Sequence, residues 1–174
     1  MKSLLVTLVS LSLAACAGAI SKFEDNPGEY GLYVAVTNID MDTPIAVKNA
    51  ATGEVVALKV RHMGNSPGYI METLQPGRYE FQSYTPDAIT DVPLTTANGY
   101  FEVQANCFNY GGQYAFGVDA DGAPAYNDSL TLKDIERLPS SIREHAVGRD
   151  ICAAGMGKPN ERLPAADVQG QIAL

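Results

Sequence analysis

The fold of this chain is decided by GLYVAVT, residues 31–37. Leu32, Val34 and Val36 occupy alternate positions, and a period of two is typical of a β-strand with one face against a core. Comparable segments follow at residues 44–49, 54–61, 69–74, 79–84, 99–107 and 113–118, and the first two flank a turn and are expected to form a hairpin. About seven short strands without a βαβ rhythm predict a mainly β protein, folded as an antiparallel β-sandwich over residues 30–128.

A Pro-Gly turn followed by an alternating strand lies in LQPGRYEF, residues 74–81. Proline fixes one dihedral angle and glycine supplies a positive one, so the pair suits the central positions of a type II turn. This Leu-x-Pro-Gly-x-Tyr-x-Phe motif resembles the turn and strand of transthyretin-like and carboxypeptidase-regulatory-like β-sandwiches, which are common in secreted and envelope proteins. The resemblance covers this stretch alone and implies a fold rather than a function.

The pattern changes from strand to helix near residue 129. Apolar residues recur at helical spacing from Leu132 to Leu138, and a capping box begins at Ser141, so two short helices are expected. Residues 129–154 are therefore predicted to be a helical appendage of the sandwich. Residues 155–174 contain two prolines and no clear periodicity, and they are predicted to be a loosely ordered tail.

The N-terminus has the layout of a secretory signal. Lys2 precedes an apolar run that ends in LAAC, residues 13–16, and the run is shorter than the ~20 residues that span a bilayer. LAAC resembles the lipobox of bacterial lipoproteins. The resemblance implies cleavage of a signal peptide, residues 1–15, and a diacylglyceride and an acyl chain on Cys16. An ordinary cleaved signal is the alternative, and residues 16–29 are predicted to be the lipidated cysteine and a flexible tether.

The residue after the cysteine bears on the membrane to which the protein is sent. In the enterobacterial lipoproteins that the motif resembles, aspartate at this position retains the protein in the inner membrane, and most other residues permit export. Ala17 therefore implies the periplasmic face of the outer membrane. The membrane is an expected partner through the covalent lipid, and no other cofactor is expected.

Composition excludes one class of partner. The formal charge is −8, and removal of residues 1–15, which contain one lysine and no acid, takes it to −9. Such a surface is a poor match for nucleic acid or bare anionic lipid. The remaining length suits one domain with a substantial core.

The two cysteines after Cys16 form an even pair. In an oxidising compartment the default expectation is a disulfide between Cys107 and Cys152, which would attach the helical appendage to the sandwich. The alternative is a catalytic Cys152 thiol with His145 as its base, and proximity in sequence is weak support for such a pair.

Motifs of catalysis and metal binding are missing from the sequence. It contains no Gly-x-Ser-x-Gly elbow and no His-Glu-x-x-His, and the DADG at residues 119–122 lacks the later ligands of a calcium loop. Glu72, Glu80 and Glu102 would form an acidic site only if they converged, whereas polar residues at such strand positions normally face solvent. We therefore expect neither an enzyme nor a metal site.

Four tyrosines are the remaining candidates for a ligand or partner surface. Tyr33, Tyr84 and Tyr100 fall opposite the apolar faces of their strands, and Tyr110 precedes a Gly-Gly pair. Outward tyrosines would stack on sugars or fill a partner's pocket, unless both sheet faces are covered.

Two hypotheses for function remain. The leading one is a non-enzymatic, membrane-anchored envelope lipoprotein that acts as an interaction or structural module in the periplasm, with a protein of the cell envelope as its partner. The alternative is a periplasmic small-molecule or glycan binding protein that uses the four tyrosines.

Overall fold

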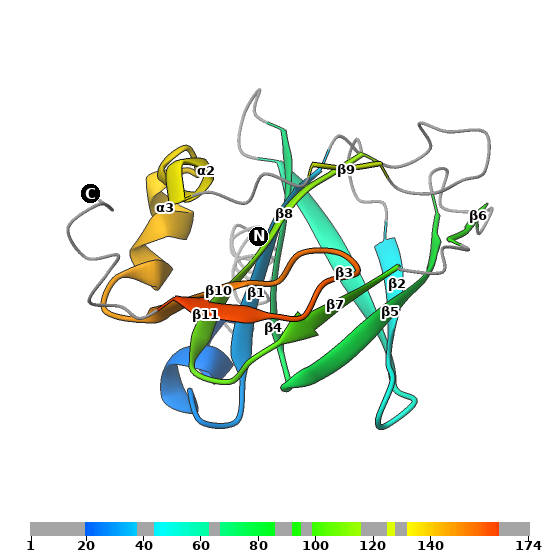
Figure 1. The fold of residues 1–174 in the computed structure, drawn as a ribbon, viewed down its shortest axis with the longest axis horizontal. Helices are drawn as coiled ribbons and strands as arrows, with labels where there is room; N and C mark the ends of the chain where they lie inside the picture. The colour runs from blue at the N-terminus through cyan, green and yellow to red at the C-terminus, as the bar shows by residue number, and fades with distance from the viewer. Residues whose placement is uncertain are drawn as a thin grey trace, which may run out of the picture.

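The computed structural model describes residues 20–37, 44–62, 67–85, 92–94, 99–115, 125–127 and 132–163. In this part the protein is mainly β, and its strands join into one curled, mixed sheet with the helices gathered on one side (Figure 1). The predicted signal peptide, residues 1–15, and Cys16 lie outside the described residues.

The elements follow one another along the chain from β1 to β11. They are β1 (Gly31–Thr37), β2 (Pro44–Asn49), β3 (Val55–His62), β4 (Gly68–Leu74), β5 (Gly77–Tyr84), β6 (Val92–Pro93), β7 (Tyr100–Val103), β8 (Cys107–Ala115), β9 (Ala125–Asn127), α2 (Leu132–Glu136), α3 (Ser140–Arg143), the 3-10 helix η1 (Glu144–Ala146), β10 (Asp150–Ala153) and β11 (Glu161–Leu163). The strand order is β11-β10-β8-β1-β4-β3-β2-β5-β6, while β7 also pairs with β5 and β9 with β8.

The sandwich of seven antiparallel strands is not confirmed. Within the described residues, β8 runs parallel to β1 and to β10, while its short pairing with β9 is antiparallel. Parallel neighbours need a long connection, and the chain between β8 and β10 carries α2, α3 and η1. The predicted helical appendage is thus part of a crossover connection between parallel strands. The prediction that the chain has no βαβ unit is wrong at this point.

The sheet curls because β3 is shared between its two halves. Residues 55–59 pair with β2, which confirms the predicted hairpin, and residues 60–62 pair with β4. The Pro-Gly connection between β4 and β5 does not form a hairpin, since β4 pairs with β1 and β3, whereas β5 pairs with β2, β6 and β7. Gly77 adopts a φ of +149°, which side-chain-bearing residues rarely adopt.

Strand β1 is buried on both faces. Tyr33 and Ala35 point into the curl of the sheet, and Leu32 and Val34 point to the opposite side, because successive strand residues alternate between faces. The inner core of the curl comprises Tyr33, Ala35, Ile45, Val47, Leu58, Val60, Ile70, Leu74, Tyr79, Phe81, Leu94, Phe101, Val103, Tyr114 and Ala154. The outer core, between sheet and helices, comprises Phe23, Leu32, Val34, Tyr69, Phe108, Tyr110, Ile135, Leu138, Ile142, Ala146 and Ile151.

The two short helices occur where the sequence predicts them, with one difference. α2 ends before Pro139, as expected. α3 begins one residue before the predicted capping box at Ser141, with Pro139 at its N-cap and no side-chain cap hydrogen bond. Ile135 and Ile142 are buried, so packing on the sheet holds both helices, and for α3 it does so without a side-chain cap.

The predicted flexible tether is wrong for part of its length, because residues 20–25 form a helix that packs on the domain. Phe23 is fully buried in the outer core, and the guanidinium carbon of Arg149 lies 4.2 Å from the centre of its ring. The Glu24 carboxylate lies 3.1 Å from Nδ1 of His145. In the predicted mature chain, residues 16–19 precede the first described residue of this helix.

The predicted loose tail is also wrong for residues 155–163, and residues 164–174 lie outside the described residues. β11 pairs with β10, and the connection between them contacts β7, because Gly157 donates its N–H to the Tyr100 carbonyl at 2.8 Å. The Asn160 side-chain amide donates to the Glu102 carbonyl at 2.6 Å. The Arg162 guanidinium donates to the Ala105 carbonyl at 2.9 Å. Backbone pairing and polar side chains thus fix a segment that has no apolar periodicity.

Asn109 lies fully buried where β7, β8 and the β10–β11 connection meet. Its side-chain oxygen accepts hydrogen bonds from the Gln104 N–H at 2.8 Å and from the Asn160 amide at 3.0 Å. Its amide donates to the carbonyl oxygens of Gln104 and Cys107, at 3.0 and 2.9 Å. All four hydrogen-bonding positions of the side chain are used, which satisfies a buried polar group and ties β7 to β8.

The predicted disulfide is confirmed. Cys107 in β8 and Cys152 in β10 are bonded, with their Cα atoms 6.0 Å apart, and both are fully buried. The bond joins two adjacent parallel strands and closes the loop that contains the helices. Cys152 is therefore not available as a catalytic thiol, and His145 pairs instead with Glu24.

We predict that removal of this bond destabilises the fold strongly. The double variant Cys107→Ala/Cys152→Ala should lose about 3–4 kcal/mol of unfolding free energy, because the unfolded chain is no longer cross-linked. Urea denaturation of the variant and the wild type measures the loss, and wild type with reductant is the control. Equal denaturation midpoints for variant and wild type would contradict the prediction.

Candidate functional site

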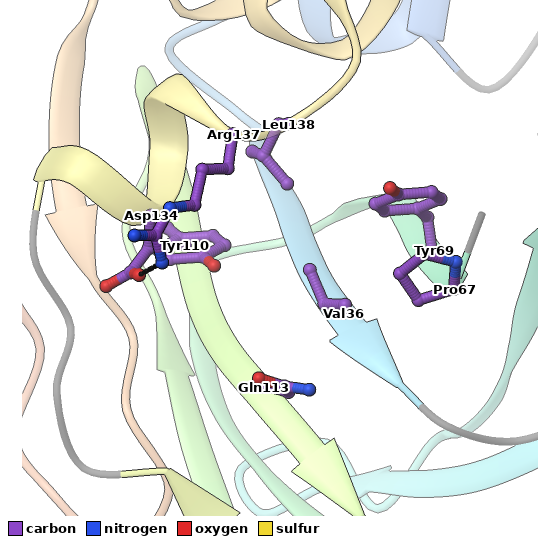
Figure 2. Close-up of a pocket in the computed structure, with 8 residues that line it drawn as sticks. All are labelled: Val36, Pro67, Tyr69, Tyr110, Gln113, Asp134, Arg137 and Leu138. Carbon is purple, nitrogen blue, oxygen red and sulfur yellow. Dashed lines mark ion pairs between the residues drawn. The ribbon is translucent and has the colours of Figure 1, made fainter.

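A partly open pocket of about 180 Å³ lies on the outer face of the sheet, beside α2 (Figure 2). Val36 of β1 forms its floor. Tyr69 of β4 and Tyr110 of β8 stand on opposite sides of this valine, and Leu138 lies at the helical side. The pocket is smaller than the roughly 300–1,000 Å³ of sites for drug-sized ligands, so its size suits a single ring.

The pocket exists because the helices cover only part of β1. Leu32, Val34 and Val36 share the outer face of the strand, as the sequence predicts. The first two are fully buried beneath the helices, whereas Val36 remains partly exposed. The helical layer therefore stops before the last outward residue of the strand and leaves a hollow there.

Strand register sets the side walls. Val36 is paired with Tyr69 on one side and with Gln113 on the other, so these three side chains form one row across three strands. Tyr110 is paired with Val34, one row earlier. Tyr69 and Tyr110 are 6% and 5% exposed, so most of each side chain is packed against its neighbours and only a small part of it is accessible from the pocket.

A bulge in β8 places Tyr110 and Gln113 on the same face. Residues three apart in a regular strand face opposite sides, but the register between β1 and β8 shifts after Val34 and inserts one residue at the Gly-Gly pair. Gly112 has a φ of +83°, which favours glycine. A Cβ on Gly111 would lie 2.4 Å from the Tyr33 hydroxyl oxygen, so only glycine fits there as well. The sequence prediction treated this pair as a break between strands, although glycine inside a strand pattern is a known signal of a bulge.

The rim of the pocket is polar and electrically balanced. Nη1 of Arg137 lies 3.6 Å from a carboxylate oxygen of Asp134 one helical turn earlier, and Arg137 is 80% exposed. Gln113 adds an exposed amide on the sheet side. In the described part of the chain, the rim therefore offers hydrogen-bond donors and acceptors together, and its two opposite charges offset each other.

The four tyrosines predicted as a ligand surface lie in separate places. Tyr33 is fully buried inside the curl, where it stacks on Phe101 with ring centres 4.0 Å apart and shares a hydrogen bond with the Tyr114 hydroxyl. Tyr84 packs against the inner core. The prediction of one outward surface is wrong because both faces of β1 are covered.

The other two tyrosines are also apart from each other. Tyr100 is on the outside of the sheet, with the guanidinium carbon of Arg78 3.7 Å from its ring centre. Tyr110 belongs to the pocket wall, so it alone of the four lies at the candidate site. Tyr69, which the sequence prediction did not single out, is its counterpart across the pocket.

The three glutamates considered from the sequence do not converge. Glu72 lies 3.8 Å from Arg61, Glu80 lies 3.7 Å from Arg78, and Glu102 accepts a hydrogen bond from the Asn160 N–H. Burial raises the pKa of the Glu72 carboxyl, and the neighbouring Arg61 guanidinium offsets part of that rise. Each glutamate thus serves a local contact rather than a shared acidic site.

Among the described residues, no group of three or more histidine, cysteine, aspartate or glutamate side chains is arranged to hold a metal ion. No helix in the described ranges is long and apolar enough to cross a membrane.

Comparison with known proteins shows no family for this chain. No protein-family model matches it, and no curated protein matches it. Among solved structures, it is similar to a leucine-rich repeat protein from Bacteroides thetaiotaomicron, at 13% identity and a TM-score of 0.30. The match covers 52% of this chain and 14% of that one, and a likeness this weak carries no argument about fold or function.

We predict that Gly111→Ala destabilises the protein by about 1–3 kcal/mol, the usual effect of forcing an extra methyl into a packed core. The added carbon would collide with the Tyr33 hydroxyl group. Gly28→Ala is the matched control, because nothing lies within 4 Å of a Cβ at that position. Thermal unfolding of the two variants measures the difference, and equal melting temperatures would contradict the role given to Gly111.

We predict that Glu72→Gln changes how stability depends on pH. A raised pKa means that the folded protein holds this proton more tightly than the unfolded chain, so the contribution is present at low pH and is lost as pH rises through the folded pKa. Glutamine is neutral at every pH. The stability of the variant relative to wild type should therefore be greater near pH 7 than near pH 4, as measured by urea denaturation. A constant difference would refute the prediction.

Proposed function

We propose that this protein is a lipid-anchored module of a bacterial cell envelope that acts by binding rather than by catalysis. The observation that carries the proposal is LAAC at residues 13–16, which resembles a lipobox and is followed within a few residues by a helix packed on the domain. Cys16 would carry the lipid, and Ala17 favours the periplasmic face of the outer membrane.

The packed helix supports a short connection between lipid and domain. From Cys16 to residue 20 the chain can reach roughly 14 Å at most. Phe23 holds the helix to the domain, so little slack remains for the domain to move away from the bilayer. An envelope partner of this module would therefore be one that comes close to the membrane surface.

Several acyl chains rather than surface charge would hold the protein at the membrane. The predicted mature chain has a formal charge of −9, which opposes contact with anionic lipid. One acyl chain binds a bilayer only reversibly, whereas two or more give stable anchoring. Attachment of this kind resists high salt and yields to detergent.

The second candidate function is recognition of a small molecule or glycan, and the pocket beside α2 favours it. The dispersed tyrosines do not support a shared binding face. Tyr69, Tyr110 and the polar rim form a compact site of their own. The two candidates are compatible, since an anchored module can also recognise a ligand.

We predict that Cys16→Ala releases the protein from the membrane fraction. Wild type should sediment with membranes, resist extraction by salt, dissolve in detergent and incorporate labelled palmitate. Ser12→Ala, a small change within the same leader, is the matched control and should behave as wild type. Equal solubility of Cys16→Ala and wild type after fractionation would contradict the anchor.

A further inference from the structure

We propose that the pocket beside α2 binds a single uncharged sugar ring. The inference deepens the proposed binding function and depends on it only for the compartment in which the ligand is met. The site is the hollow over Val36, between Tyr69 and Tyr110 and below the Asp134–Arg137 pair.

The walls fit the apolar faces of a sugar. A pyranose ring has C–H groups on its two faces and hydroxyl groups around its edge. Val36 and Leu138 offer apolar contact, and the two tyrosine side chains stand on opposite sides of the hollow (Figure 2). Because these tyrosines are held by packing, they lose little conformational freedom when a ligand binds.

The rim fits the hydroxyl groups. A hydroxyl group both donates and accepts hydrogen bonds, and the rim provides a carboxylate acceptor on Asp134, guanidinium donors on Arg137 and an amide with both functions on Gln113. Among the lining residues that the structure describes, Asp134 and Arg137 are the charged ones and they pair with each other, so neither charge is left to select an ion. The acidic chain as a whole also disfavours an anionic ligand.

A charged side chain of a partner protein is therefore a poorer occupant. Such a group would need an opposite charge that is not already paired. To bind here it would have to break the ion pair between Asp134 and Arg137. A neutral aromatic side chain would use the walls and leave the polar rim without a role.

The pocket and the N-terminal helix lie toward opposite ends of β1. Phe23 and the start of β1 at Gly31 lie at one end, and Val36 lies roughly 16 Å further along the strand. Figure 1 shows the N-terminal helix and α2 at opposite ends of β1.

The test is a titration of the full-length, isotope-labelled protein in detergent, followed by NMR. The probes are N-acetylglucosamine and glucose, with p-cresol as a stand-in for a partner's tyrosine side chain and chitotetraose as a model of a glycan strand. The Val36 methyl and Gln113 side-chain amide signals should shift with at least one of the two monosaccharides. The Val55 methyl signal, from a 61% exposed valine in β3, should not shift.

The first pair of variants tests the location. Val36→Phe fills the floor of the pocket and should abolish the shifts, whereas the matched Val55→Phe should leave them unchanged. If Val36→Phe fails to fold, Arg137→Ala decides, because that side chain is largely exposed. It should weaken binding about tenfold through the loss of a charged hydrogen bond, while Arg78→Ala, from another surface ion pair, should not.

Three results would overturn the inference. The first is that neither monosaccharide shifts the pocket signals. The second is that p-cresol alone shifts them, which would assign the pocket to a protein side chain. The third is that the sugar-induced shifts persist in both Val36→Phe and Arg137→Ala, which would place the binding site elsewhere. Binding of monosaccharide and chitotetraose together would identify a ring within a glycan, and binding of the monosaccharide alone a free sugar. Membrane release of Cys16→Ala is a separate measurement, so the anchor and the pocket can fail independently.

Discussion

The structure depends on the burial of β1 on both faces. One face of this strand supplies Tyr33 to the inner core, and the other supplies Leu32 and Val34 to the outer core. A strand with two apolar faces cannot lie at the surface of an antiparallel sheet with one solvated side. It requires a second layer, and the helices between β8 and β10, together with residues 20–25, provide that layer. The parallel pairing of β10 with β8 is the topological consequence, since the helical connection between these two strands returns the chain to the same end of the sheet.

The two cores meet through a small set of constrained contacts in β8. Gly111 allows the Tyr33 hydroxyl to reach Tyr114 in the inner core, and the bulge at Gly112 turns Gln113 outward on the other face. Asn109, earlier in the strand, satisfies its four hydrogen-bonding positions at the junction with β7. Residues of β8 therefore contribute to the packing of the inner core, to the outer pocket and to the contact with β7. The disulfide bonds this strand to β10.

Sequence reasoning predicted the features that local patterns determine. Alternation located β1, the β2–β3 hairpin follows from two alternating runs around a turn, and cysteine parity predicted the disulfide. It did not predict the features that depend on tertiary partners. Nothing local distinguishes a strand covered on one face from one covered on both, so Tyr33 was assigned outward. The same limit applies to Phe23, a lone aromatic residue in a polar stretch, and to β11, which is held by pairing with β10 and by Asn160.

The pocket shows how a site arises from incomplete coverage rather than from a motif. Its floor is the third member of a series, Leu32, Val34 and Val36, of which the helices cover only two. Tyr69 reaches the pocket through strand register, and Asp134 and Arg137 reach it through the place where α2 lies on the sheet. None of these residues is unusual in its own stretch of sequence. Because Tyr69 and Tyr110 are packed on their other sides, the two tyrosine walls are held in place. A half-apolar site of one-ring size whose rim charges pair with each other is suited to recognise a ligand by shape and hydroxyl pattern rather than by charge.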